Sequence, residues 1–207
     1  NTFVDAMATD VEKARYETYD ELRAYMDGSA AAVGRMMTAV MAPDRADEAL
    51  PAATALGEAF QLTNFVRDVR EDVIERDRIY LPAETLEAHG SSHEQIARLE
   101  FDENVAGAVQ AELSRAEALY RDGVAGIELL PEDCQFPVLL AAILYADHHR
   151  LIRDLDYDVV STTPSLSTPR KLYLAARARL AWWRNPEPRA VFRSVSAIPS
   201  DETDHRL

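Results

Sequence analysis

The chain of 207 residues is 47% hydrophobic and long enough to bury one sizeable core, so we expect a single domain or a large piece of one. A formal net charge of −14, with no basic stripe to offset it, argues against nucleic acid as a partner. The single cysteine, Cys134, excludes an internal disulfide, and no apolar run reaches the length that a membrane-spanning helix needs.

The first part of the chain predicts helices separated by prolines. Residues 11–25 predict a short exposed helix, and small residues and methionines predict a second helix from Ala30 to Met41. Pro43 ends that segment, and Pro51 is expected in the first turn of the next helix, which continues to about Arg76.

The remaining segments also have helical spacing, and none alternates strictly enough to require a sheet. The Gly90–Ser92 loop is expected to cap the helix that follows it. Prolines from Pro131 to Pro137 are expected to interrupt the chain, and residues from Asn185 onward are expected to form a loose tail. The predicted helices are Ala83–Ala88, His93–Leu99, Asp102–Asp122, Val138–Tyr157 and Arg170–Trp183.

A polar stripe within the third helix is the strongest chemical signal. Gln61, Asn64, Asp68 and Asp72 project within roughly 80° of one another at about 100° per residue. Two carboxylates one turn apart repel each other, and a Mg²⁺ ion that also binds substrate phosphate would offset the repulsion. Arg67 and Arg70 flank the stripe and are expected to reach the same phosphate. A solvated charged face is the alternative interpretation of this spacing.

Three blocks of sequence resemble the squalene and phytoene synthase family of head-to-head prenyl synthases, up to about Arg184. The most specific is QLTNFVRDVREDV followed by RIYLP, which resembles the second aspartate-rich motif of the family. The other two are ELRAYMDGSAAAVGRMM, from Glu21, and LYADHHRLIRDLDYDVVSTTPSLSTPRKL, from Leu144. The sequences of these blocks are most similar to those of prokaryotic phytoene synthases.

The resemblance implies an all-α, isoprenoid-synthase-type helical bundle around a prenyl-diphosphate cavity. It also implies condensation of two geranylgeranyl diphosphates to phytoene through a cyclopropyl diphosphate intermediate, a step of carotenoid biosynthesis. The alternatives are squalene or dehydrosqualene synthesis from farnesyl diphosphate, and an isoprenoid-binding subunit without activity.

The resemblance also assigns roles to individual residues. Asn64, Asp68 and Asp72 would bind Mg²⁺, with Mn²⁺ as an alternative, and Gln61 and Arg67 would hold phosphate oxygens. Tyr25 and Tyr145 would lie near the reacting carbons, although each could equally be a core tyrosine. The residues expected to line the prenyl cavity, which helix packing alone would also explain, are Ala30, Val33, Gly34 and Met37.

One expected feature of the family is missing from this sequence. Its first aspartate-rich helix precedes the block that begins here at Glu21, and Asp5 and Asp10 do not match that motif because five positions separate them. We therefore interpret residues 1–184 as the C-terminal portion of one prenyl synthase domain and 185–207 as a tail. Such a chain would hold half of the metal site.

Several other residues invite a functional interpretation. His148 and His149 are adjacent and point about 100° apart on a helix, so we expect surface or interface residues and no shared metal. Cys134 is expected to be a small packed side chain. Trp182 and Trp183 with nearby arginines could lie on a lipid surface and aid product release, but we favour packing on the core because the chain is acidic.

The charged residues are strongly biased. Lys13 and Lys171 are the only lysines among 22 basic residues, against 36 acidic ones. A GC-rich genome alone would explain the arginine bias, but not the acidity. Excess carboxylates keep a protein surface hydrated in concentrated salt, so we expect a halophilic source, with a haloarchaeon as a candidate. No signal peptide is recognisable, which favours a cytoplasmic location.

Overall fold

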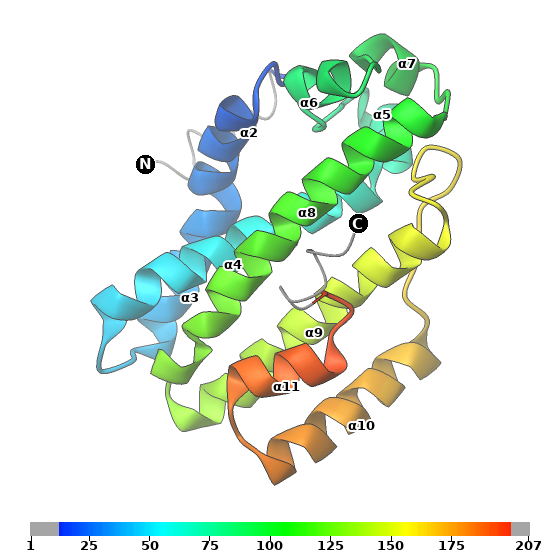
Figure 1. The fold of residues 1–207 in the computed structure, drawn as a ribbon. Helices are drawn as coiled ribbons and strands as arrows, with labels where there is room; N and C mark the ends of the chain where they lie inside the picture. Colours follow the sequence, from blue (N-terminus) through cyan, green and yellow to red (C-terminus); the bar gives the residue numbers. More distant parts are fainter. Residues whose placement is uncertain (1–12, 200–207) are drawn as a thin grey trace.

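Residues 13–199 are described by the computed structural model, and they form an all-helical bundle (Figure 1). The predicted fold class is confirmed: no β-strand forms in this range, where an isolated bridge joins Arg15 and Ile79. No helix of the described range is long and apolar enough to cross a membrane. The elements are α2 (Tyr19–Met26), the π-helical turn η1 (Asp27–Ala31), α3 (Ala32–Met41), α4 (Ala46–Arg67), α5 (Val69–Arg76), α6 (Ala83–Ala88), α7 (His93–Ala97), α8 (Glu103–Ala125), the 3₁₀ turn η2 (Ile127–Leu129), α9 (Glu132–Asp154), α10 (Thr168–Arg184) and α11 (Pro188–Val195).

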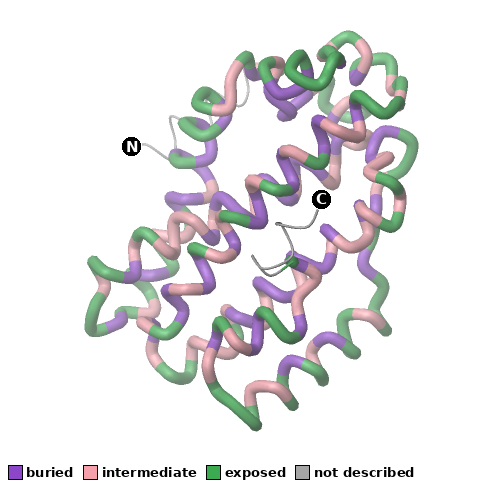
Figure 2. Tube along the Cα trace, viewed as in Figure 1, coloured by how far each residue is buried: buried purple, intermediate pink, exposed green. Residues whose placement is uncertain are grey.

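The long helices α4 and α8 lie side by side at the centre of the molecule (Figure 1). α3 and η1 pack on another side of α4, and α9 also contacts α4. Buried residues recur along these helices and alternate with exposed ones (Figure 2). The largest buried cluster joins α4, α8, α9, α10 and α11.

Several helix boundaries follow the local capping signals. Ser92 accepts a hydrogen bond from the Gln95 backbone N–H, so the predicted cap of α7 is confirmed. Asp102 caps α8 in the same way by accepting from the N–H groups of Asn104 and Val105, at 3.0 and 2.9 Å. The predicted short helix Ala83–Ala88 forms as α6.

The two proline predictions are wrong. Pro51 lies inside α4, beyond its first turn, and Pro137 lies inside α9 and does not interrupt it. A proline within a helix removes one intrahelical hydrogen bond. Here both sit near the helix start, and burial of the helices that carry them offsets that loss.

The predicted loose tail is also wrong for the described residues after Asn185. Glu187 caps α11 by accepting from the N–H groups of Arg189 and Ala190. Val191 and Phe192 are buried in the main core cluster, where the Phe192 ring lies 6.1 Å from that of Tyr120. Prolines and polar residues suggested disorder because they dominate the exposed side of a helix whose other side is apolar.

α3 approaches α4 closely because two glycines face backbone atoms. A Cβ added to Gly34 would lie 2.4 Å from the carbonyl oxygen of Ala53, and one added to Gly57 would lie 2.5 Å from that of Ala30. Neither separation is sterically tolerable, so both positions require glycine at this helix spacing. The contact between backbones brings the outward side chains of α3 over the edge of α4.

Gly34→Ala should destabilise the protein by about 1–3 kcal/mol, because α3 must move away from α4 to admit the methyl group. Gly107→Ala is the matched control in α8, where the added methyl meets the movable ring of His89. Chemical denaturation of both variants checks the difference. Equal stability of Gly34→Ala and the parent would contradict the close approach.

Candidate functional site

The predicted polar stripe lies along the end of α4 and the start of α5. The Asp68 N–H donates to the Asn64 carbonyl and the Asp72 N–H donates to the Asp68 carbonyl, both at 2.8 Å, so helical bonding continues through the junction. Gln61, Asn64, Asp68 and Asp72 line one recess of about 270 Å³ together. The structure thus brings all four residues of the stripe to one place.

Both carboxylates in this recess are paired with arginines. Arg67 holds Asp68 with two parallel hydrogen bonds, Nε–Oδ1 at 2.7 Å and Nη2–Oδ2 at 2.5 Å. Arg76 donates to Asp72 Oδ1, and it also lines the recess. Sequence analysis missed Arg76, although its spacing of four residues from Asp72 on one helix was a usable signal.

Arg70 does not join this group. Its Nη1 donates to the carbonyl oxygen of Val160 at 3.0 Å, and its side chain is not part of the recess wall. The prediction that Arg70 reaches the same phosphate as Arg67 is therefore not supported. Its observed contact instead anchors the 155–167 connection against α5.

Burial perturbs the chemistry of the two innermost polar side chains. Asp72 is 4% exposed, and desolvation raises its pKa from 3.8 to about 6 despite the opposing effect of Arg76. The nearby Asp68 and Glu71 carboxylates raise the pKa further. Asn64 Oδ1 is buried and has no hydrogen-bond partner in the structure. Both groups would be stabilised by a cation in the recess.

The donor set fits a hard divalent cation. Within the described residues, no three side chains of His, Cys, Asp or Glu gather closely enough to form a metal site. The recess offers the carboxylates of Asp68 and Asp72 and the amide oxygen of Asn64. These ligands suit Mg²⁺ or Mn²⁺ when phosphate and water supply the others. Asp5 and Asp10, which do not match the first aspartate-rich motif of the family, lie outside the described residues.

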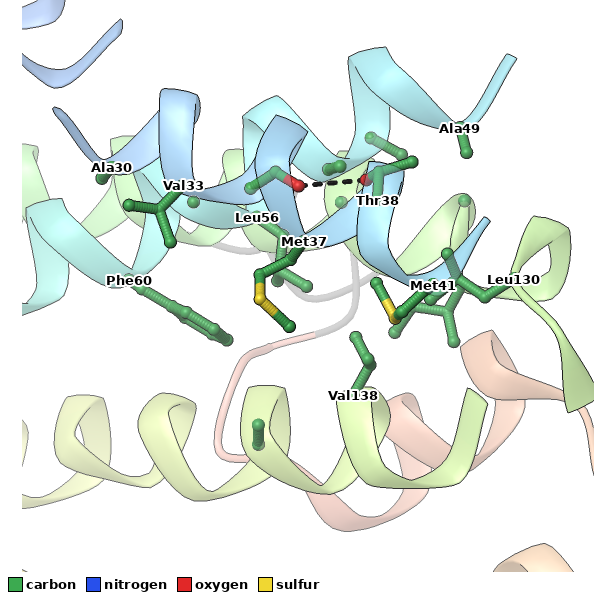
Figure 3. Close-up of a pocket in the computed structure, with 18 of the residues that line it drawn as sticks. Ala30, Val33, Met37, Thr38, Met41, Ala49, Leu56, Phe60, Leu130 and Val138 are labelled. Atoms are coloured by element: carbon green, nitrogen blue, oxygen red, sulfur yellow. Dashed lines mark hydrogen bonds between the residues drawn. The ribbon is translucent and has the colours of Figure 1, made fainter. Parts of the chain in front are cut away.

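An apolar cavity of about 380 Å³ begins where the polar stripe ends. Its wall contains one continuous stripe of α4, in which successive residues are separated alternately by three positions and by one. In Figure 3, Met37 and Met41 of α3 and Phe60 of α4 face Val138 of α9 across this space. The α4 residues of the wall are Ala49, Ala52, Ala53, Leu56, Gly57, Phe60, Gln61 and Asn64.

The cavity is elongated along α4. Fifteen residues separate Ala49 from Asn64, which corresponds to roughly 22 Å along the helix axis. Gln61 and Asn64 belong both to this cavity and to the acidic recess, so the two spaces meet at these amides. The arrangement suits an amphiphile with a long apolar chain and an anionic head.

The structure places each predicted wall residue of α3 and η1 around this cavity. Ala30, Val33, Gly34 and Met37 all line it. Gly34 has a second role in the contact with α4 described above. Sequence analysis did not name Met41, Phe60 or Val138, because their inclusion depends on which helices meet.

Tyr145 lines the same cavity from α9, and its ring stacks on Phe60 with 4.5 Å between centroids. It also lines a second recess, of about 650 Å³, which contains Arg67, Asp68, His148 and Lys171. Tyr145 therefore stands between the apolar space and the charged residues. Its role beside the reacting carbons stays a prediction.

Tyr25 is not part of the wall of either space. It is 8% exposed and packs in an aromatic cluster with Tyr16, Phe65 and Tyr80. The Phe65 ring lies 6.1 Å from Tyr25 and 3.9 Å from Tyr80, and Tyr80 lines the acidic recess. In this structure Tyr25 supports the recess from behind.

The prediction that His149 is a surface residue is wrong, because its side chain is fully buried. Thr63, the neighbour of Asn64, is 2.9 Å from His149 Nε2 and 3.1 Å from the Tyr120 hydroxyl. His149 Nδ1 lies 3.2 Å from Glu117, which also accepts from Arg153. Burial lowers the pKa of His149, so the neutral imidazole links the site helix to α8 and α9. His148 is half-buried and lines the second recess.

Comparison with protein families gives a match to the squalene/phytoene synthase model over residues 1–184. The 15-cis-phytoene synthase of Synechocystis sp. is 36% identical over 187 residues, which cover 84% of this chain and 54% of that protein. The phytoene synthase of Thermus thermophilus is 34% identical, over 89% of this chain and 62% of that protein. The chain thus spans about half to three fifths of these two relatives.

Solved structures give the same picture. A dehydrosqualene synthase crystallised with a ligand superposes with a TM-score of 0.80 at 26% identity, over 88% of this chain and 64% of that one. The squalene synthase HpnC of Alicyclobacillus acidocaldarius gives a TM-score of 0.71 at 27% identity, over 75% and 59% of the two chains. The helical arrangement is therefore shared beyond the sequence motifs.

The raised pKa of Asp72 predicts a pH-dependent effect of Asp72→Asn on stability. Stability that depends on protonated Asp72 is fully present below about pH 3.8 and is lost as the pH rises through about 6. The neutral amide avoids this loss, so Asp72→Asn should gain up to about 3 kcal/mol over the parent between pH 4 and pH 7. Denaturation across this range checks it.

The exposed Glu75→Gln on the same helix is the control and should follow the parent at every pH. An Asp72→Asn variant whose stability runs parallel to the parent across this range would show that Asp72 is not protonated preferentially in the folded protein.

Proposed function

Because the chain belongs to the squalene/phytoene synthase family, we propose that this protein is a prenyltransferase that condenses two geranylgeranyl diphosphates head to head to phytoene. The observation that carries the proposal is the elongated apolar cavity that ends on the recess of Asn64, Asp68 and Asp72. A prenyl diphosphate has the same division into an apolar chain and an anionic head. The two relatives described above are phytoene synthases, which supports phytoene as the product.

The polar recess would bind the diphosphate. Asn64, Asp68 and Asp72 would hold Mg²⁺, or Mn²⁺ in its place, and the buried, partnerless Oδ1 of Asn64 favours this assignment. The ion would supply positive charge that stabilises the departing diphosphate. Arg67 is 2.7 Å from Asp68 and would exchange part of that pairing for phosphate oxygens, with Gln61 as a further donor.

The cavity would protect the reaction from water. When the C–O bond of the allylic diphosphate breaks, the electron pair leaves with the diphosphate and a carbocation remains. The stacked rings of Phe60 and Tyr145 present faces that attract positive charge. Alanine, glycine, leucine, isoleucine and valine residues supply most of the remaining wall, and their side chains carry no nucleophile, so the cation would be left for the second prenyl chain.

Other properties of the whole protein stay proposals. The protein would need a second carboxylate motif facing Asp68 and Asp72, since the described residues supply only one. The acidic composition supports a halophilic source, and a cytoplasmic location stays a prediction. Phytoene is insoluble in water, so contact with a membrane would aid its release.

Product analysis of the full-length protein with Mg²⁺ and geranylgeranyl diphosphate, at low and high salt, should yield phytoene. Asp68→Asn and Asp72→Asn should lower turnover at least 100-fold, because each removes a carboxylate from the site. Mg²⁺ with inorganic diphosphate should raise the melting temperature of the parent and leave that of both variants nearly unchanged.

The alternatives predict other outcomes. Consumption of farnesyl diphosphate alone would indicate a squalene or dehydrosqualene synthase, as the names of the structural relatives suggest. Binding of prenyl diphosphate without any product would indicate a non-catalytic isoprenoid-binding subunit. Normal turnover by either aspartate variant would refute the metal assignment.

Chain-length selection should depend on the end of the cavity far from Asn64. Met41→Trp fills that end, so it should lower the use of the C20 substrate at least tenfold relative to the C15 substrate. Met36→Trp is the matched control, because Met36 is on the same helix, half-exposed and absent from the cavity wall. Competition between the two substrates measures the ratio. An equal loss with both substrates would contradict the direction assigned to the prenyl chain.

A further inference from the structure

Three buried polar side chains form a row behind the site, one from each of the helices α4, α9 and α8. The Thr63 hydroxyl lies 2.9 Å from Nε2 of His149, and Nδ1 of His149 lies 3.2 Å from Oε1 of Glu117. A hydroxyl, an imidazole and a carboxylate in this order activate a nucleophile in many hydrolases. Here none of the three lines the cavity or either recess, and they are 0%, 0% and 7% exposed, so no substrate reaches them. The row therefore requires another explanation.

The partners of the imidazole determine where its proton lies. Glu117 accepts a hydrogen bond from Arg153, and a carboxylate can only accept, so a lone pair on Nδ1 of His149 would face it unfavourably. Burial lowers the pKa of His149, which keeps the ring neutral. Nδ1 therefore carries the single proton and donates to Glu117, whereas Nε2 is an acceptor.

This tautomer also fixes the direction of the Thr63 hydroxyl. The hydroxyl has one proton and two acceptors within reach, the Ala59 carbonyl at 2.8 Å and His149 Nε2 at 2.9 Å. With Nε2 as an acceptor, Thr63 donates to the imidazole, and the Tyr120 hydroxyl, 3.1 Å away, donates to Thr63. All the donors then point towards Glu117, and hydrogen bonds arranged head to tail strengthen one another.

α4 and α9 meet through two neighbouring contacts, and Thr63 forms one of them. The other is the stack of Phe60 on Tyr145, whose ring centroids lie 4.5 Å apart. The contacting residues are three positions apart on α4 and four apart on α9, so both contacts lie on the same faces of the two helices. Stacked rings can slide past each other, whereas a hydrogen bond has a preferred distance and angle. The polar contact therefore fixes how α4 is rotated against α9.

The rotation of α4 decides where Asn64 points. Asn64 follows Thr63 directly and projects about 100° from it, towards the junction of the cavity and the acidic recess. Its buried Oδ1 has no hydrogen-bond partner among the described residues, so no bond of its own holds that oxygen in place. The position of this oxygen therefore depends on the helix that carries it.

The row extends to a segment beyond the family match. Arg153, which donates to Glu117, also donates from Nη1 to the Ala197 carbonyl at 3.1 Å. Ala197 follows α11, whereas the match to the family model ends at residue 184. α10 and α11 hold this segment on the bundle, and the fully buried Leu174 and Ala178 confirm the packing predicted for α10. The end of the chain thus helps to hold Glu117 in place.

We propose that Glu117, His149 and Thr63 are positioning residues, which hold α4 in the rotation that turns Asn64 to the junction of the cavity and the recess. Apolar side chains of similar shape stabilise a core as well as buried polar ones do, so stability alone does not account for the row. Buried polar groups are best attested as devices that fix the register of helices. The effect on catalysis rests on the proposed function, whereas the effect on Asn64 does not.

Nuclear magnetic resonance of the full-length protein with ¹⁵N-labelled histidine tests the proton positions. His149→Phe identifies the signals of His149 by their loss. In the parent, Nδ1 should carry the proton and Nε2 should carry none. Glu117→Met removes the acceptor, so the proton should move to Nε2, from which it donates to Thr63. A proton on Nε2 in the parent, or one that stays on Nδ1 in Glu117→Met, would overturn the proposal, because Glu117 would then not control the imidazole.

The side-chain amide signals of Asn64 report its position in protein with ¹⁵N-labelled asparagine. Thr63→Val keeps the shape of the side chain and removes the hydroxyl, so these signals should broaden or double rather than only shift. Thr63→Ser keeps the hydroxyl and should retain a single sharp pair. Sharp, single Asn64 signals in Thr63→Val would overturn the proposal.

Thr85→Val is the matched control for a loss of stability. Thr85 is another buried threonine, its hydroxyl donates to the buried Glu112 at 2.6 Å, and neither residue lines the cavity or either recess. The variant should lower the melting temperature as Thr63→Val does, because each leaves a buried polar group without its partner. It should leave the Asn64 signals unchanged, and broadening in both variants alike would reduce the row to a purely structural role.

Product formation links the row to the proposed reaction. With geranylgeranyl diphosphate and Mg²⁺, Thr63→Val should lower kcat about tenfold or more, whereas Thr63→Ser and Thr85→Val should stay within about twofold of the parent. A parent that makes no phytoene but shows the expected Asn64 signals would refute the proposed function and still support the positioning role. Phytoene formation by Thr63→Val at the rate of the parent would instead refute the positioning role.

Discussion

Close packing of backbones against α4 is the constraint on which the rest of the structure depends. Gly34 and Gly57 allow α3 and η1 to contact α4 without intervening side chains. The side chains of Val33 and Met37 then line the cavity between α4 and α9. Because one face of α4 forms the cavity wall and its end carries the polar stripe, the same contact fixes the position of both.

The acidic recess reflects a conflict between stability and chemistry. A buried carboxylate is unfavourable even beside an arginine, and the raised pKa of Asp72 shows that burial outweighs Arg76. Asn64 Oδ1 adds a second unfavourable group at the same place. Unfavourable polar groups concentrated at one position are typical of sites that are completed by a ligand. The side chains of Thr63, Tyr120, His149, Glu117 and Arg153, by contrast, are joined by hydrogen bonds, and they hold together the helices behind this site.

Local chemistry made part of this structure predictable from the sequence. Caps such as Ser92 act within one turn, and the stripe from Gln61 to Asp72 follows from the period of a single helix. The roles of Ala30 and Met37 needed the family resemblance, because spacing alone equally fits helix packing. The prolines at 51 and 137 misled because packing of a whole helix outweighed one lost hydrogen bond. The burial of His149 depends on Glu117, 32 residues away, and a single sequence does not reveal such pairs.

The match to the family and the hydrophobic core end at different residues, and α11 lies between the two ends. Similarity to the family model ends at residue 184, whereas Val191 and Phe192 close the core over Tyr120 and Val124. The shared chemistry thus ends before the folding unit does. A gene shortened at residue 184 would therefore encode a protein without Val191 and Phe192, whose core would be open and prone to aggregate.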